Sequence, residues 1–239
     1  DGAGFPAIAD NHPNNGGPRG IAISFHLAEH VNTDIIGHSV DGFPVRTPEE
    51  FLEFLRAAHA GAPIQAFLAA HPAALAFVQT PKPVPTSFAR ESYFTVTAFK
   101  FTSADGNVRF GRFRVRPEGG NEYLDPAAAA AKSPNFLMDE IAERASKGQA
   151  KLQIVVQLAE SGDTVDDATA HWPEDRTQAD FGTVALTAVA PDDDEHRRII
   201  FDPIPRVDGI DSSGDPLLEA RSAVYLMSGR RRRAAAATA

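Results

Sequence analysis

Cysteine is absent from this 239-residue chain, which excludes disulfide bonds, thiolate metal sites and cysteine nucleophiles. Long apolar runs are absent too, and none approaches the roughly 20 residues of a membrane-spanning helix, so we expect no membrane partner. The 23 basic residues are outnumbered by 32 acidic ones, and the formal charge of -9 argues against a nucleic-acid partner. A chain without cysteine is typical of a reducing compartment, which favours a cytoplasmic location.

The composition is that of an ordinary globular protein. Hydrophobic residues make up 43% and charged residues 23% of the chain, which is long enough to bury a sizeable core. We therefore interpret residues 1–239 as a single domain. The first residue is Asp1 rather than Met, so we expect an amino-terminal segment of the native protein to precede it.

Hydrophobic alternation and turn residues indicate a sheet. They predict strands at 21–25, 34–37, 92–102, 108–116, 151–159 and 181–189. Asp105 and Gly106 favour a hairpin between the strands at 92–102 and 108–116. Helices are predicted at 48–60, at 63–79 in two pieces around Pro72, at 134–148 and at 217–229. This order favours an α+β fold, an antiparallel sheet of about eight strands closed into a β-barrel with helices packed outside.

One side-chain pair in the last predicted helix could carry chemistry. Arg221 and Tyr225 are four residues apart and therefore share a helix face. A nearby guanidinium favours the phenolate form of tyrosine, which is a hard oxygen ligand suited to ferric iron. From spacing alone, a surface arginine lying over a half-buried tyrosine is the commoner arrangement.

The longer string around this pair is more specific. It reads Gly209-Ile210-Asp211-Ser212-Ser213-Gly214-Asp215-Pro216-Leu217-Leu218-Glu219-Ala220-Arg221-Ser222-Ala223-Val224-Tyr225, followed by Arg230 and Arg232. This string resembles the proximal haem motif of the haem catalases and matches each of its fixed positions. The stretches 43–51 and 87–90 and the short end at 230–233 are most similar to the small catalase-related peroxidases. The resemblance implies a catalase-like fold with a buried haem.

The resemblance also implies roles for individual residues. Tyr225 would be the axial ligand of the iron of haem b, and Arg221 would stabilise its phenolate. Arg232 would pair with a haem propionate, with Arg230 as a second candidate. A solvated basic tail is the alternative reading of the arginine run at 230–233.

The opposite face of the haem is where the sequence departs from catalases. The family's essential distal histidine lies upstream of the part of a catalase that this chain resembles, so we expect it before Asp1. The distal asparagine of catalases falls after Gly37, where this chain has His38 and Ser39. Ser39 occupies the matching position and could offer a hydroxyl to a bound peroxide. His38 could instead point inward as a catalytic residue, or lie in solvent as loop histidines usually do.

A second sequence pattern resembles a metal-binding motif, but it is weaker evidence for a metal site. Residues 26–30 spell the His-x-x-Glu-His pattern of inverted zinc proteases, but that pattern belongs on a helix and needs a further ligand. In this chain it follows a predicted strand. We therefore expect no metal site at this position.

The leading functional hypothesis is a haem peroxidase that reduces hydrogen peroxide or organic hydroperoxides, with weak or no catalase activity. Its partners would be a small-molecule peroxide and an organic electron donor. Two alternatives remain: a haem-binding barrel without turnover, and a catalase-like isomerase of fatty-acid hydroperoxides. The sequence leaves open whether the chain forms a homo-oligomer.

Overall fold

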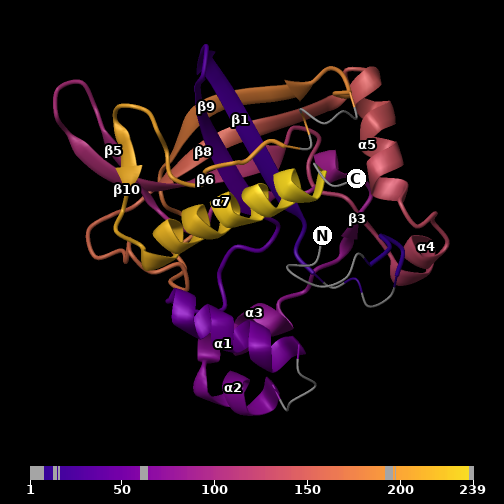
Figure 1. Ribbon diagram of the computed structural model, residues 1–239, viewed down its shortest axis with the longest axis horizontal. Coiled ribbons are helices and arrows are strands. Elements are labelled where there is room, and N and C mark those ends of the chain that lie inside the picture. Colours follow the sequence, from indigo (N-terminus) through magenta and orange to yellow (C-terminus); the bar gives the residue numbers. More distant parts are fainter. Residues whose placement is uncertain are drawn as a thin grey trace.

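The computed structural model describes residues 8–12, 15, 17–59, 64–191, 196 and 198–236, and its centre is a strongly curled antiparallel sheet (Figure 1). The eight strands are β1 (Gly20–Ala28), β2 (Val31–His38), β4 (Tyr93–Phe94), β5 (Phe99–Thr102), β6 (Val108–Pro117), β8 (Ala150–Leu158), β9 (Gln178–Leu186) and β10 (Ile210–Ser212). One path through the sheet runs β1-β2-β4-β6-β5-β10, and β8 joins β6 to β9. Every one of these pairings is antiparallel, as predicted.

Strand β6 holds the sheet together because it is paired on both edges. One edge carries β4 and β5 and the other carries β8, so Val115 lies opposite both Tyr93 and Ile154. Strands β1 and β9 lie far apart in the pairing order, yet the rings of Phe25 and Phe181 meet edge to face, 6.5 Å between centroids. The sheet therefore curls into a half-barrel.

The predicted strand at 92–102 is two strands in the structure. Strands β4 and β5 both pair with β6, but the four residues between them leave the regular ladder. Within this break the side-chain hydroxyl of Thr95 accepts a hydrogen bond from the backbone amide of Phe113 (2.9 Å). The alternation of residue types cannot reveal such a break, because it continues through residues 95–98 without a proline or glycine to mark the interruption.

The helices agree with the predicted ones, with two differences. They are α1 (Pro48–His59), α2 (Ile64–Ala70), α3 (Pro72–Gln79), α4 (Pro126–Ala130), α5 (Phe136–Ser146) and α7 (Pro216–Ala236). Helix α4 was not predicted; the side chain of Asp125 caps it by accepting from the Ala128 amide (2.8 Å). Helix α7 continues past Gly229, where we expected it to end. A Cβ at that glycine would lie 2.4 Å from side-chain atoms of Ile200, so close packing explains the residue.

The main hydrophobic core lies on the inner face of the sheet. It comprises Ile35, Tyr93, Phe99, Phe113, Val115, Leu152, Ile154 and Val156 from the strands and Leu218 from α7. Helix α7 therefore crosses the sheet with its first turn anchored in the core (Figure 1). Helices α1 to α3, here called the helical arm (residues 48–79), lie below α7 in the same view, and α1 contacts α7.

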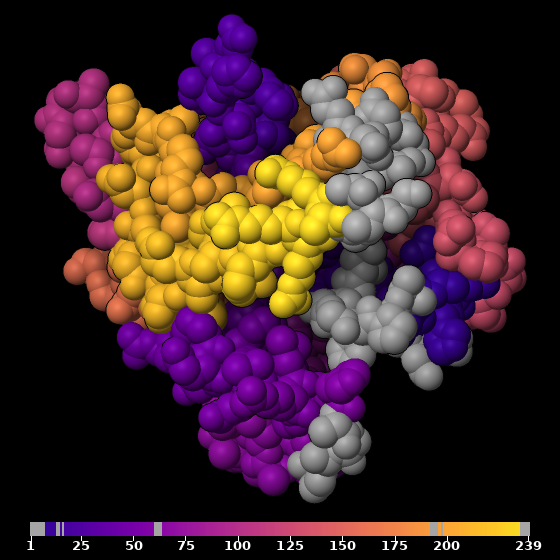
Figure 2. Space-filling view, in the orientation of Figure 1, coloured from indigo at the N-terminus to yellow at the C-terminus, as the bar shows by residue number. Residues whose placement is uncertain are grey.

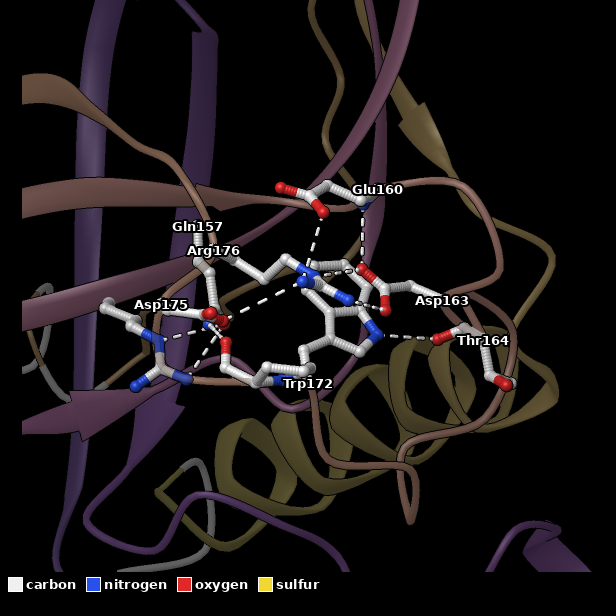
Figure 3. Close-up of polar contacts among 9 residues, drawn as sticks. Gln157, Glu160, Asp163, Thr164, Trp172, Asp175 and Arg176 are labelled. Carbon is white, nitrogen blue, oxygen red and sulfur yellow. Dashed lines mark hydrogen bonds and ion pairs between the residues drawn. The ribbon is translucent and has the colours of Figure 1, made fainter.

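A long loop joins β8 to β9, and its Ala168 packs with Leu217 of α7; Figure 3 shows the polar contacts of this loop. Arg176 donates two hydrogen bonds to the carboxylate of Asp163 (2.9 and 3.0 Å), and Trp172 donates to the carbonyl of Thr164 (2.8 Å). The guanidinium of Arg112 lies 4.3 Å from the Trp172 ring centroid. These contacts give the loop a fixed shape without regular secondary structure.

Two smaller features complete the fold. Strand β3 (Val84–Pro85) pairs with β7 (Tyr123–Leu124), and a 3-10 turn, η1, spans Phe88–Arg90. The pattern at 26–30 lies on the end of β1 and the following turn rather than on a helix, and no metal-binding group of acidic or histidine side chains occurs among the described residues. Within the same described ranges, no helix is both long and apolar enough to cross a bilayer.

Candidate functional site

A cavity of about 950 Å³ lies between α7, the start of the sheet and the helical arm. This volume is at the upper end of the roughly 300–1,000 Å³ typical of ligand pockets. Most of its lining is aliphatic or aromatic, and it includes Arg221, Tyr225 and Arg232 from one wall and His38 from the other. The structure thus brings together residues that are almost 190 positions apart in the sequence.

The face of α7 toward the cavity follows helical spacing. Arg221, Tyr225, Ser228 and Arg232 all line the cavity, and their separations of four, three and four residues place them on one stripe. The opposite stripe is open to solvent, with Met227 52% exposed, and Figure 2 shows α7 lying along the surface of the molecule above the helical arm. One stripe of the helix therefore carries arginine and tyrosine side chains to the cavity, while other charged residues of α7, such as Glu219 and Arg230, are exposed.

The predicted pair on α7 is in contact. A terminal nitrogen of Arg221 donates a hydrogen bond to the phenol oxygen of Tyr225, at 3.4 Å. Both side chains are partly buried, and the guanidinium carbon lies 5.8 Å from the tyrosine ring centroid. The guanidinium of Arg221 is therefore placed to donate a hydrogen bond to the oxygen atom of Tyr225.

The two carboxy-terminal arginines differ in position. Arg232 lines the cavity, and its guanidinium donates to the carbonyl of Ile199 (3.0 Å). Arg230 is exposed and is not among the residues that line the cavity. A carboxylate at the end of the cavity could therefore reach Arg232 but not Arg230 without rearrangement.

A segment before β10 ties α7 to the sheet. The side chain of Asp34 on β2 accepts a hydrogen bond from the backbone amide of Asp202 (2.7 Å). The carboxylate of Asp202 in turn accepts from the hydroxyl of Ser222 on α7 (2.8 Å). These two bonds fix the distance between the β2 wall and the α7 wall of the cavity.

His38 lies at the end of β2, on the wall opposite α7. Gly37 precedes it and permits a close approach of the neighbouring strand, since a Cβ there would lie 2.9 Å from the carbonyl oxygen of Phe94. The His38 ring contacts the rings of Phe43 and Phe77, with centroid separations of 6.3 and 6.4 Å. The histidine is therefore held against aromatic side chains and does not lie free in solvent.

The protonation state of His38 follows from its surroundings. Burial lowers its pKa to about 4, helped by the positive charges of Arg221 and Lys82, so the ring is neutral at neutral pH. The amide of Val40 donates to Nδ1 (3.3 Å), which places the proton of the neutral ring on Nε2. Nε2 is buried and has no hydrogen-bond partner among the described residues. It is an available donor on a residue that lines the cavity.

Ser39 is engaged elsewhere. Its hydroxyl accepts a hydrogen bond from the backbone amide of Arg19 (2.9 Å), its own amide donates to the carbonyl of the same residue (2.8 Å), and it is not among the residues lining the cavity. Of the two neighbours that we singled out by sequence, the structure thus brings His38 to the cavity and leaves Ser39 at the junction with β1.

Sequence reasoning missed much of the wall formed by the helical arm. Phe51, Phe54 and Leu55 line the cavity, although helical periodicity alone suggests that they face a solid core. No side chain of α1 is fully buried. Lys82, in the loop after α3, also lines the cavity, and no sequence signal marks it.

Comparisons with known proteins show which proteins this chain is similar to. The family model described as Catalase matches residues 9–238. A catalase-related peroxidase of Mycolicibacterium paratuberculosis is 34% identical over 238 residues, covering 95% of this chain and 74% of that protein. Another from Synechococcus elongatus is 33% identical over 237 residues, covering 94% and 69%. Catalase-2 of Bacillus subtilis is 26% identical, covering 87% of this chain and 34% of that protein.

Solved structures show the same fold. A fungal catalase superposes with a TM-score of 0.81 at 22% identity, covering 96% of this chain and 50% of that chain. Catalase A from Saccharomyces cerevisiae also gives 0.81, at 20% identity and with 96% and 51% coverage. The chain therefore spans about half the length of these two solved chains.

Proposed function

This chain belongs to the catalase family, and from this premise we propose that it is a haem peroxidase that reduces hydrogen peroxide or organic hydroperoxides. The observation that carries the proposal is the contact of Arg221 with Tyr225 on a helix face that lines a large, mainly apolar cavity. The catalase-related peroxidases among its relatives support the same activity. We further propose that the domain extends over residues 1–239 and that the curled sheet closes around one haem.

The residues of the cavity fit a haem in several respects. An apolar lining suits a flat macrocycle, and the phenol of Tyr225 is a hard oxygen ligand suited to ferric iron. Arg221 donates a hydrogen bond to that phenol oxygen and would also hold it when it binds iron. Arg232 supplies a positive charge for a propionate, and the orphaned Nε2 of His38 supplies a polar group on the other wall.

Each residue would have a separate task. Tyr225 would hold the iron, and Arg221 would donate a hydrogen bond to the ligating oxygen of Tyr225. When bound, ferric haem supplies the redox chemistry that cleaves the oxygen–oxygen bond of a peroxide. Overall, the peroxide takes up two electrons from an organic donor and two protons, its oxygen–oxygen bond breaks, and an alcohol and water, or two waters, are released.

His38 would orient the peroxide. Because its neutral ring carries the proton on Nε2, it would donate a hydrogen bond to a peroxide oxygen, but it would not accept the peroxide's proton at neutral pH. Ser39 would have no direct part while its hydroxyl accepts from Arg19. A group that accepts this proton is still required, and we propose that it is the histidine expected upstream of Asp1.

A visible absorption spectrum of the purified protein, followed by donor-oxidation assays with hydrogen peroxide and an alkyl hydroperoxide, tests the proposal. We expect a ferric haem spectrum and donor-dependent turnover. A haem spectrum without turnover would favour a non-catalytic haem-binding protein. Rearrangement of a fatty-acid hydroperoxide without donor oxidation would favour the isomerase. Failure to bind haem at all would overturn the proposal.

A further inference from the structure

The cavity is lined by charges of one sign. Its charged lining residues are Lys82, Arg221 and Arg232, and no aspartate or glutamate occurs among the described residues that line it. The chain as a whole has a formal charge of -9. A cavity whose charge is opposite to that of the whole chain attracts anionic ligands selectively.

Lys82 differs from the two arginines in position. Both arginines lie on α7, and Arg221 is bonded to the Tyr225 phenol. Lys82 comes from the opposite wall, where the ring of Phe77 contacts both Lys82 and His38. The Nζ atom of Lys82 lies 5.0 Å from the centroid of the Phe77 ring, and the centroid of the His38 ring lies 6.4 Å from that centroid. This cation therefore belongs to the His38 end of the cavity.

The ammonium of Lys82 is held in place but not neutralised. Nζ donates to the carbonyls of Phe77 (2.7 Å) and Thr80 (2.9 Å), which leaves one of its three N–H donors unused by these bonds. No carboxylate pairs with it in the part of the chain that the structure describes. Burial lowers the pKa of Lys82, and an anion bound beside it would offset that cost of desolvation.

We propose that Lys82 binds the carboxylate of an organic acid whose apolar tail occupies the aromatic part of the cavity. Phe43, Phe51 and Phe54 line that part and would contact the tail. The inference rests on the proposed function in one respect: the acid would be the organic hydroperoxide or the electron donor of the peroxidase reaction. A carboxylate at Lys82 would hold such a molecule at the His38 end of the cavity.

Binding of decanoate and of decan-1-ol to the purified protein, measured by isothermal titration calorimetry, tests this proposal. The two probes share the same tail, but only decanoate carries a charge at pH 7. In the Lys82→Gln variant we expect decanoate to bind about five- to tenfold more weakly and decan-1-ol to bind unchanged, because only the charge-assisted bond is lost. Lys82→Arg should restore most of the decanoate affinity.

The matched control is Lys147→Gln, since Lys147 is an exposed lysine at the C-cap of α5 and is not among the residues lining the cavity. It should leave both affinities unchanged. The haem-to-protein ratio is recorded for each variant, because a haem propionate is the other carboxylate that could reach Lys82. A lower haem ratio in Lys82→Gln with unchanged decanoate affinity would overturn the proposal, as would an equal loss of affinity for both probes. Calorimetry does not need haem, so failure of the peroxidase proposal would be recognised separately.

Discussion

The two walls of the cavity are built in different ways. The α7 wall comes from one helix, and its functional side chains repeat at helical spacing between Arg221 and Arg232. The opposite wall comes from several separate segments: β2, the loop after it, the helical arm and the loop after α3. The residues of a wall made by one helix can be predicted from a short stretch of sequence. The residues of a wall assembled from distant segments can be identified only from the fold.

The largest effect is expected on the single-helix wall. Tyr225→Phe removes the proposed ligand oxygen and should lower haem affinity by at least about a hundredfold, because loss of a mere outer-shell partner already costs a metal site about 10- to 100-fold. Haem content by absorption spectroscopy measures the change. Tyr123→Phe, at an exposed tyrosine on β7, is the control and should keep its haem. A Tyr225→Phe protein with the wild-type ferric spectrum would show that iron is held elsewhere.

On the opposite wall, which is assembled from several segments, the expected effect is on peroxide turnover rather than on haem retention. His38→Phe removes the Nε2 donor and should reduce peroxide turnover about tenfold, while His38→Gln, which keeps an N–H donor, should lose less. Steady-state donor oxidation measures both variants at equal haem content. If His38→Phe turned over peroxide as fast as the wild type, His38 would have only a packing role.

The same histidine should also make stability depend on pH. The folded-state pKa of His38 is lowered to about 4, below its ordinary value of 6.5, so only the unfolded chain takes up this proton between those values. The stability contributed by the neutral ring is full above about pH 6.5 and is lost as the pH falls toward 4.

Urea unfolding of the wild type and of His38→Gln at pH 7 and pH 5 measures this contribution. Between these two values we expect the wild type to lose about 1 kcal/mol more than the variant, because His38 takes up its proton mainly in the unfolded chain. Identical losses in both proteins would mean that the histidine has the same pKa in the folded and unfolded states.

The smallest effect separates two arginines of one helix. Arg232→Ala removes a cation from the cavity and should weaken haem binding about threefold, as expected for one partly exposed ionic contact. Arg230→Ala removes an exposed arginine two residues away and should have no effect. Haem dissociation rates are measured for both variants. Equal effects of the two substitutions would indicate that haem binding depends only on net charge.

The sequence predicted the regular parts of the fold well, for physical reasons. Alternation predicted β6 and β8, because each has one face in the core, and Pro72 marked the division between α2 and α3 because proline disrupts a continuing helix. Gly229 was misread as the end of α7, because packing against Ile200 gives no local signal.

The site was predicted less evenly. The Arg221 and Tyr225 pair followed from helical spacing and from a long motif, and the structure places the two side chains in contact. The lowered pKa of His38 and the presence of Lys82 in the cavity could not be predicted, since both depend on residues brought close by the fold. Ser39 was chosen because it occupies the position of the distal asparagine of catalases in the sequence. In the structure its hydroxyl accepts a hydrogen bond from the backbone amide of Arg19.

The position of α7 at the end of the described chain has a consequence for biosynthesis. Strand β10 and α7 close onto elements made more than a hundred residues earlier, since Asp211 pairs with Lys100 and α7 contacts α1. Contacts this distant in sequence form slowly and only after the intervening chain is available. The cavity therefore cannot form until α7 itself has been synthesised and has left the ribosome, so a ligand of this cavity can stabilise the finished fold but cannot guide the earlier steps of folding.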